Sequence, residues 1–147
     1  MKAQRKPITI LMAEDDPDDR MLAKDAFEEC RLVNALLFVE NGEQLMDFLH
    51  RRGAYTDAPR PGLILLDLNM PIMDGREALA LIKADPQFSS IPVIALTTSQ
   101  AEEDVMRSYA SGVNSYIVKP VSFTGLVEVM RGLAQYWLEI VEIPGAP

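Results

Sequence analysis

The chain has 147 residues, 48% of them hydrophobic and 24% charged, and its net charge at pH 7 is -8. These values are typical of one globular domain, so they exclude a disordered or fibrous protein and leave no room for a second domain. The negative charge argues against binding to nucleic acid, and no apolar run approaches the roughly 20 residues that span a membrane.

The single cysteine, Cys30, excludes an internal disulfide, and no apolar segment follows the basic N-terminus to form a signal peptide. We therefore expect a cytoplasmic protein. Cys30 is expected to be a buried thiol, and the single histidine, His50, a solvated surface residue. One cysteine and one histidine form neither a zinc cluster nor a catalytic dyad.

The first predicted element is a strand over Ile8–Ala13, which five carboxylates follow in the stretch EDDPDD. Helix capping explains three of them, because an acid at the N-cap, a proline after it and two acids in the first turn suit a helix that begins after Asp16. Glu14 and Asp15 precede this cap. Two carboxylates about 4 Å apart repel by roughly 1 kcal/mol in water and roughly 4 kcal/mol at an effective dielectric near 20. A positive group must therefore hold them.

Four more short apolar runs predict strands, at Ala35–Val39, Leu63–Leu66, Val93–Leu96 and Tyr116–Val118. Three intervening helices begin with capping-box spacing, at Asn41–Gln44, Asp74–Glu77 and Ser99–Glu102. Near-continuous apolar strands are typical of a parallel sheet covered on both faces. The alternation predicts an α/β fold, a flavodoxin-like doubly wound five-stranded parallel sheet of order 2-1-3-4-5 with five helices. The segment Gly53–Gly62 is expected to be a surface loop.

Three carboxylates are expected to meet at one edge of this sheet. The third predicted strand leads into Asp67, and in this strand order its end lies beside the end of the first strand, which Glu14 and Asp15 follow. Asp67 alone would be an ordinary turn residue. Three convergent carboxylates suit a hard divalent cation, and magnesium fits best because calcium would need more protein ligands.

A hydroxyl and a cation are expected at the same edge. The fourth strand leads into Thr97, and the fifth into Lys119, which Pro120 holds extended. Each alone would be ordinary packing or a solvated side chain. Together with magnesium they suit a phosphoryl group on Asp67, because metal and ammonium neutralise its charge while the hydroxyl binds one oxygen.

These residues resemble the response-regulator receiver domains of two-component signalling over roughly residues 7–138. The motifs that carry the resemblance are Glu14-Asp15, DLNMPIMDG over Asp67–Gly75, Thr97 after PVIAL, and YIVKP over Tyr116–Pro120. We expect a single receiver domain over residues 1–147, with its core at about 7–138 and a C-terminal helix extension and tail at about 139–147.

The resemblance implies roles for these residues. Asp67 would accept a phosphoryl group from the phosphohistidine of a histidine kinase. Asp15 would bind magnesium directly, Glu14 would act through water, and the main-chain carbonyl of Asn69 would be another ligand. Lys119 would pair with the acceptor and then with the phosphoryl group.

Thr97 and Tyr116 would be the switch pair, and the Lys119–Pro120 peptide is expected to be cis. The resemblance implies a signalling receiver limited to self-phosphorylation and autodephosphorylation, whose output is changed binding to an unknown downstream protein. Two departures bear on the site. Glu14 replaces the commoner aspartate, and Thr98 is bulkier than the usual alanine or glycine, which affects access to the phosphoryl group.

The PDD opening of the first helix, the long loop before the third strand and the ending AQYWLEIVEIP are most similar to stand-alone regulators of bacterial phytochrome kinases. After Pro120 we expect one helix and a tail, with no DNA-binding domain. The predicted core stripe of this helix is Phe123, Leu126, Val127, Met130, Leu133, Ala134, Trp137 and Leu138. A second stripe favours a homodimer through this helix over scattered exposed residues: Val129, Tyr136, Ile140 and Ile143.

Three other functions fit the sequence less well. A magnesium phosphatase of the haloacid-dehalogenase type would need a second aspartate two residues after the nucleophile, where Asn69 stands. A flavodoxin would need hydroxyls and amides for phosphate in the turn after the first strand, which here is acidic. A phosphorylation-independent scaffold would be expected to lack the acceptor or the lysine, and both are present.

Overall fold

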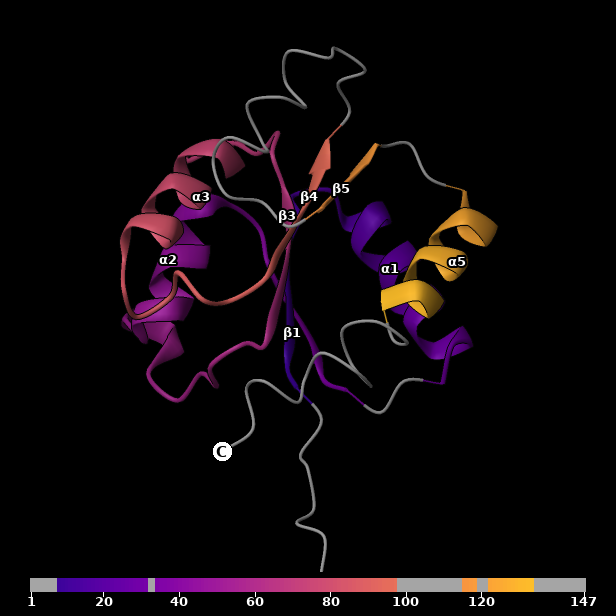
Figure 1. Cartoon of the computed structure of the whole chain (residues 1–147), viewed down its shortest axis with the longest axis horizontal. Helices are drawn as coiled ribbons and strands as arrows, with labels where there is room; N and C mark the ends of the chain where they lie inside the picture. Colours follow the sequence, from indigo (N-terminus) through magenta and orange to yellow (C-terminus); the bar gives the residue numbers. More distant parts are fainter. Residues whose placement is uncertain (1–7, 32–33, 98–114, 119–121, 134–147) are drawn as a thin grey trace, which may run out of the picture.

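The computed structural model describes residues 8–31, 34–97, 115–118 and 122–133 of the chain (Figure 1). Its strands are β1 (Ile10–Ala13), β2 (Leu36–Val39), β3 (Leu63–Asp67), β4 (Val93–Thr97) and β5 (Ser115–Val118). Its helices are α1 (Pro17–Glu29), α2 (Gly42–His50), the short 3-10 helix η1 (Gly53–Tyr55), α3 (Gly75–Ala84) and α5 (Phe123–Leu133). The helix predicted to begin at Ser99 lies outside the described residues.

The strands form one parallel sheet in the order β2-β1-β3-β4-β5, as predicted. Helices α2 and α3 pack side by side on one face, and α1 and α5 pack side by side on the other (Figure 1). The flavodoxin-like doubly wound fold is therefore confirmed. The described residues contain four of the five expected α-helices, and the fifth would fall within residues 98–114.

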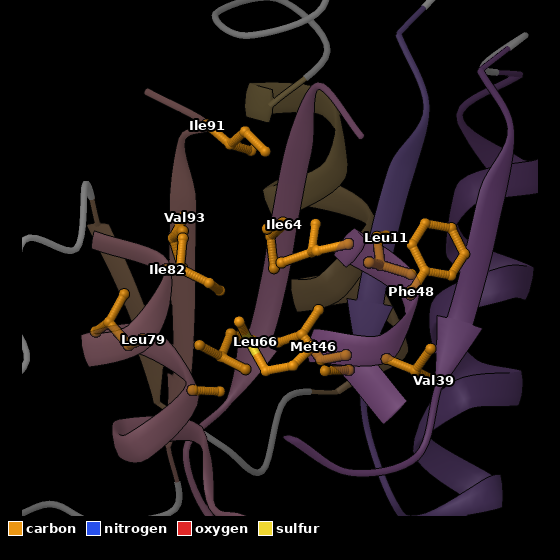
Figure 2. Packing of buried hydrophobic residues seen from close by; sticks show 14 of the residues in the cluster. Leu11, Val39, Met46, Phe48, Ile64, Leu66, Leu79, Ile82, Ile91 and Val93 are labelled. Atoms are coloured by element: carbon orange, nitrogen blue, oxygen red, sulfur yellow. The ribbon is translucent and has the colours of Figure 1, made fainter. Parts of the chain in front are cut away.

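Side chains along the inner strands alternate between two buried clusters, one on each face of the sheet. Leu11, Ile64 and Val93 pack under α2 and α3, where Figure 2 shows them with Phe48 and Ile82. The next residue of each strand belongs to the cluster under α1 and α5, which contains Ile10, Met12, Leu65, Ile94 and Leu96. Because both faces are covered, every position of these strands must be apolar, which explains the unbroken apolar runs.

The three predicted N-caps within the described ranges, Asp16, Asn41 and Asp74, are confirmed. Each side chain accepts a hydrogen bond from a backbone N–H two or three residues further on, at 2.8 Å for Asp16 and for Asn41 and at 2.9 Å for Asp74. Pro17 is the first residue of α1. These caps place the positive ends of α1 and α3 at the edge of the sheet where the strands end.

The C-terminal helix differs from its predicted stripes at two positions. Phe123 is 42% exposed rather than buried, because side chains lean toward the helix N-terminus and the first residue therefore leans past the end of α5. Val129 is partly buried against the α1/α5 cluster, since it neighbours Leu126 on the helix surface. Burial of Leu126, Val127 and Met130 is confirmed. Outside the described part of the chain lie Ala134, Tyr136, Trp137, Leu138, Ile140 and Ile143.

At the amino ends of β3 and β4 the loop around Gly53–Gly62 is bound to its neighbours. Arg60 donates from Nη1 to the carbonyl of Gln87 at 2.6 Å. Lys83 donates to two carbonyls of the same α3–β4 connection at 3.0 and 3.1 Å, and burial lowers the pKa of its ammonium. His50 is exposed, as predicted. This end of the sheet is opposite the carboxylates.

Cys30 packs against the α1/α5 cluster with Sγ 3.5 Å from the Val127 carbonyl, but it is half-buried rather than buried as predicted. The reason is its place at the C-cap, where α1 ends and no further turn of the helix covers the side chain. Among the helices of the described ranges, none is both long and apolar enough to cross a bilayer.

Candidate metal centre

The register of the sheet brings the acidic ends of β1 and β3 together. Ala13 pairs with Leu66 across these strands, so the next residues, Glu14 and Asp67, lie side by side. With Asp15 they form a group in which one carboxylate oxygen of each residue lies within 4.8 Å of the others. The predicted convergence of the three carboxylates is therefore confirmed.

The three carboxylates differ in exposure. Glu14 is 0% and Asp67 2% exposed, whereas Asp15 faces solvent. Glu14 Oε2 accepts a hydrogen bond from the Asp16 N–H at 3.2 Å, and Asp67 Oδ1 accepts one from the Asn69 N–H at 3.0 Å. Charges are rarely buried unless they are paired or bind a metal. Oxygen ligands with one side open to water suit magnesium, which keeps several of its waters.

Backbone packing holds Asp67 at the end of β3. The Gly75 N–H donates to the Leu68 carbonyl at 3.1 Å, so the start of α3 lies directly against the strand end. A Cβ at Gly75 would lie 2.2 Å from the Asp67 carbonyl oxygen and 2.6 Å from the Leu68 Cα. The Gly42 N–H, at the start of α2, donates to the Met73 carbonyl at 2.9 Å. Two glycines therefore allow two helices to approach the β3–α3 connection.

The remaining predicted site residues are located only in part. Thr97 ends β4 and pairs with Val118 of β5, the residue before Lys119. The side chains of Thr97 and Tyr116 are not among those described. Lys119, the predicted cis peptide to Pro120, and Thr98 also lie outside the described residues. Their roles stay predictions.

Sequence reasoning missed two arginines at the carboxylate cluster. Arg20 of α1 donates from Nη1 to the Glu14 carbonyl at 2.7 Å, and Arg76 of α3 donates from Nη1 to the Leu68 carbonyl at 3.4 Å. The sequence does contain a sign of both. Each arginine lies near the N-terminus of its helix, where a positive charge opposes the helix dipole, so an arginine at that position needs a reason outside the helix. These arginines bring positive charge to the two acidic strand ends.

The comparison with known families agrees with this architecture. The family model described as the response regulator receiver domain matches residues 10–131. The chain belongs to the response regulator receiver family. This match confirms the family expected from the sequence motifs, and the likeness to solved receiver structures confirms the fold. Receiver domains of this kind are the phosphorylated components of two-component signalling.

Three relatives are especially informative about this receiver domain. Response regulator Rcp1 of Synechocystis sp. is 41% identical over 140 residues, which cover 95% of each chain. A probable methanogenesis regulatory protein, FilR2 of Methanothrix harundinacea, is 36% identical over 140 residues, or 95% of this chain and 89% of FilR2. The phosphorylated cyanobacterial phytochrome response regulator RcpA superposes with a TM-score of 0.84 at 39% identity, covering 91% of this chain and 96% of RcpA.

Rcp1 has also been solved with a divalent metal. Its Mn(2+)-bound form superposes on this receiver domain with a TM-score of 0.83 at 41% identity, over 91% of this chain and 96% of that chain. The cluster of Glu14, Asp15 and Asp67 is consistent with the same kind of ion. The receiver domain therefore has a divalent cation site suited to Mg²⁺.

Magnesium is expected to stabilise the wild-type receiver domain against heat, because an ion that binds only the folded state adds about 2.7 kcal/mol at a hundredfold excess over its dissociation constant. Asp15→Asn removes one of three like charges. In EDTA the variant should melt at or above the wild-type temperature, and it should lose most of the gain with Mg²⁺. Thermal melts monitored by circular dichroism measure both effects.

Asp57→Asn is the matched control, because Asp57 is an exposed acid in the loop before β3. It should melt like the wild type with and without Mg²⁺. An Asp15→Asn protein that melts well below the wild type in EDTA would contradict the account of repulsion within the cluster.

Proposed function

We propose that Asp67 accepts a phosphoryl group from the phosphohistidine of a histidine kinase in a magnesium-dependent reaction, and that phosphorylation changes the binding of this chain to another protein. The observation that carries the proposal is the convergence of Glu14, Asp15 and Asp67 at the carboxyl ends of β1 and β3. A carboxylate beside a divalent cation site is suited to in-line attack on phosphorus.

In the proposed reaction, a carboxylate oxygen of Asp67 attacks the phosphorus and the bond from phosphorus to the histidine nitrogen breaks. The imidazole leaves with the electron pair of that bond. The Asn69 N–H, which donates to Asp67 Oδ1 at 3.0 Å, orients the carboxylate for this attack. Magnesium, when bound, neutralises negative charge on the phosphoryl oxygens. Lys119 is proposed to pair with the acceptor and then with the phosphoryl group.

Exposure supports different metal roles for the two acids of the β1–α1 turn. Asp15 faces solvent, as expected for a carboxylate that binds a partly hydrated ion directly. Glu14 is fully buried and its Oε2 accepts the Asp16 N–H, which supports coordination through a water. The main-chain carbonyl of Asn69 completes the proposed set of protein ligands together with Asp67.

The proposed function is tested by incubating the chain with acetyl phosphate, a small acyl-phosphate donor, and measuring its intact mass. The wild type should gain the mass of one phosphoryl group in the presence of Mg²⁺. In EDTA it should gain none, because no cation then neutralises the repulsion between the Asp67 carboxylate and the phosphoryl oxygens of acetyl phosphate. Equal labelling with and without the metal would overturn the magnesium requirement.

The identity of the kinase is proposed from the relatives. RcpA is named as a cyanobacterial phytochrome response regulator and is 39% identical, so a bacterial phytochrome histidine kinase is the proposed donor. We also propose a single receiver domain over residues 1–147, which turns over only its own phosphoryl group and acts through an unidentified downstream protein. Its cytoplasmic location stays a prediction.

Thr97 and Tyr116 are proposed to form the switch. In the β4–β5 register Thr97 pairs with Val118 and Ala95 with Tyr116, so the two switch residues are diagonal neighbours on the sheet. Thr97→Ala should still be phosphorylated but should lose most phosphorylation-dependent partner binding, because its hydroxyl no longer moves to the phosphoryl oxygen. Capture of proteins from cell extract by beryllofluoride-loaded chain measures this loss.

Thr56→Ala, in the loop at the other end of the sheet, is the control for the switch and should capture the same proteins as the wild type. Equal capture by loaded wild type and loaded Thr97→Ala would refute the switch role.

A homodimer through the C-terminal helix is proposed from the apolar residues Tyr136, Ile140 and Ile143. Burying one large apolar side chain contributes roughly 1.5 to 3 kcal/mol, so three on each subunit can offset the cost of association. Light scattering at tens of micromolar should give a dimer for the wild type and a monomer for Tyr136→Glu combined with Ile140→Glu. The control Met21→Glu changes an exposed apolar residue of α1 and should stay dimeric. A monomeric wild type, phosphorylated or not, would overturn the proposal.

A further inference from the structure

Arg20 and Arg76 bind main-chain carbonyls on the two sides of the carboxylate cluster. Arg20, the fourth residue of α1, donates from Nη1 to the Glu14 carbonyl at 2.7 Å, back at the end of β1. Arg76 Nη1 lies 3.4 Å from the Leu68 carbonyl, which also accepts the Gly75 N–H at 3.1 Å. Each arginine therefore reaches from a helix to the strand end that precedes that helix.

Each of these carbonyls belongs to the peptide that precedes a proposed metal ligand. The Glu14 carbonyl shares its peptide plane with the N–H of Asp15. The Leu68 carbonyl shares its plane with the N–H of Asn69, which donates to Asp67 Oδ1 at 3.0 Å. Because the peptide unit is planar, a group that holds the carbonyl also holds the direction of the N–H. Hydrogen bonds in such a series also strengthen one another.

These arginines do not stabilise α1 and α3 as isolated helices. A cation near a helix N-terminus opposes the helix dipole and so does not stabilise the helix. Both side chains are nevertheless held partly buried, and that of Arg76 is only 29% exposed. Arg76 Nη1 also forms an ion pair with Asp74 Oδ2 at 3.9 Å. Its shorter contact, with the Leu68 carbonyl at 3.4 Å, links the start of α3 to the end of β3.

We propose that Arg20 and Arg76 are positioning residues for the metal centre, which hold the Glu14–Asp15 and Leu68–Asn69 peptides so that the oxygen ligands are arranged before Mg²⁺ binds. The inference rests on the proposed function, because it takes Asp15 and Asn69 as metal ligands.

Positioning and charge have opposite effects on metal affinity. Removing a positive charge beside a cation site strengthens the attraction between the carboxylates and Mg²⁺, so a role through charge alone predicts tighter binding after mutation. Removing a group that positions the ligands predicts weaker binding. Loss of a group that supports metal ligands commonly reduces metal affinity 10- to 100-fold. We expect about tenfold weaker Mg²⁺ binding in Arg20→Gln and in Arg76→Gln, at the low end of that range.

The experiment is isothermal titration of Mg²⁺ alone into metal-free protein, with no phosphoryl donor present. The matched control is Arg60→Gln, which removes the same charge and a guanidinium–carbonyl bond of 2.6 Å, to Gln87, at the opposite end of the sheet. Weaker binding in Arg20→Gln and Arg76→Gln with unchanged binding in Arg60→Gln supports the inference. Tighter or unchanged binding in the two variants, with their folds verified by circular dichroism, would overturn it.

Lysine variants keep the inference testable if a glutamine variant does not fold. Arg20→Lys and Arg76→Lys retain the charge but replace the planar fork of donors by a single ammonium. Positioning predicts that both lysine variants bind Mg²⁺ more weakly than the wild type, whereas an unchanged affinity would count against it. Failure of the proposed function would be visible in the wild type itself, as absence of metal binding or of phosphorylation, and absence of metal binding would overturn both proposals.

Discussion

Asp67→Asn is expected to abolish phosphorylation by acetyl phosphate while the protein remains folded. A carboxamide is isosteric with the carboxylate but is not a nucleophile toward phosphorus, so the loss should be complete rather than partial. The amide oxygen can still accept the Asn69 N–H that the carboxylate accepts at 3.0 Å. Intact-mass measurement after incubation with Mg²⁺ and acetyl phosphate gives the labelled fraction.

The fold of Asp67→Asn should be at least as stable as that of the wild type in EDTA. Asp67 is 2% exposed and lies within the carboxylate cluster, so the substitution removes a buried like charge. Asp16→Asn is the control, because Asp16 is a neighbouring acid whose N-cap role asparagine fills equally well. This control should be labelled like the wild type. Stoichiometric, persistent labelling of Asp67→Asn would show that another residue is the acceptor.

Gly75→Ala is expected to destabilise the protein severely and to reduce its phosphorylation. The added Cβ would lie 2.2 Å from the Asp67 carbonyl oxygen and 2.6 Å from the Leu68 Cα, and both are backbone atoms that no side-chain rotation can move away. Either α3 or the end of β3 must shift. Inserting one carbon into a packed site usually costs about 1 to 3 kcal/mol, and contact with backbone on two sides places this variant at the upper end.

Urea denaturation measures the change in unfolding free energy, and intact mass measures the labelled fraction. Gly132→Ala makes the same chemical change within α5, where the described structure has nothing within 4 Å of the added Cβ. That control should be more stable than the wild type by about 0.5 to 1 kcal/mol, because alanine is the better helix former. A Gly75→Ala protein as stable as the wild type would contradict the close packing of α3 on β3.

Local sequence alone determined the caps and the strands. Asp16, Asn41 and Asp74 cap helices through bonds to residues two or three positions away, so nothing distant is needed to predict them. The unbroken apolar runs indicate strands of a parallel sheet that is covered by helices on both faces. Because the crossovers of such a sheet are right-handed, only a few strand orders are compatible with it. The meeting of Glu14, Asp15 and Asp67 followed from that order.

The tertiary structure decided the features that depend on residues distant in the chain. Phe123 and Val129 share the apolar character of their neighbours, and only the packing of α5 against α1 and the sheet determined which of them is covered. The need for glycine at position 75 depends on the approach of α3 to the backbone of Asp67, which no local pattern encodes. The sequence places Arg20 near the N-terminus of a helix but does not show its partner. That partner is the Glu14 carbonyl, which lies within reach of Arg20 because of where the preceding strand ends in space.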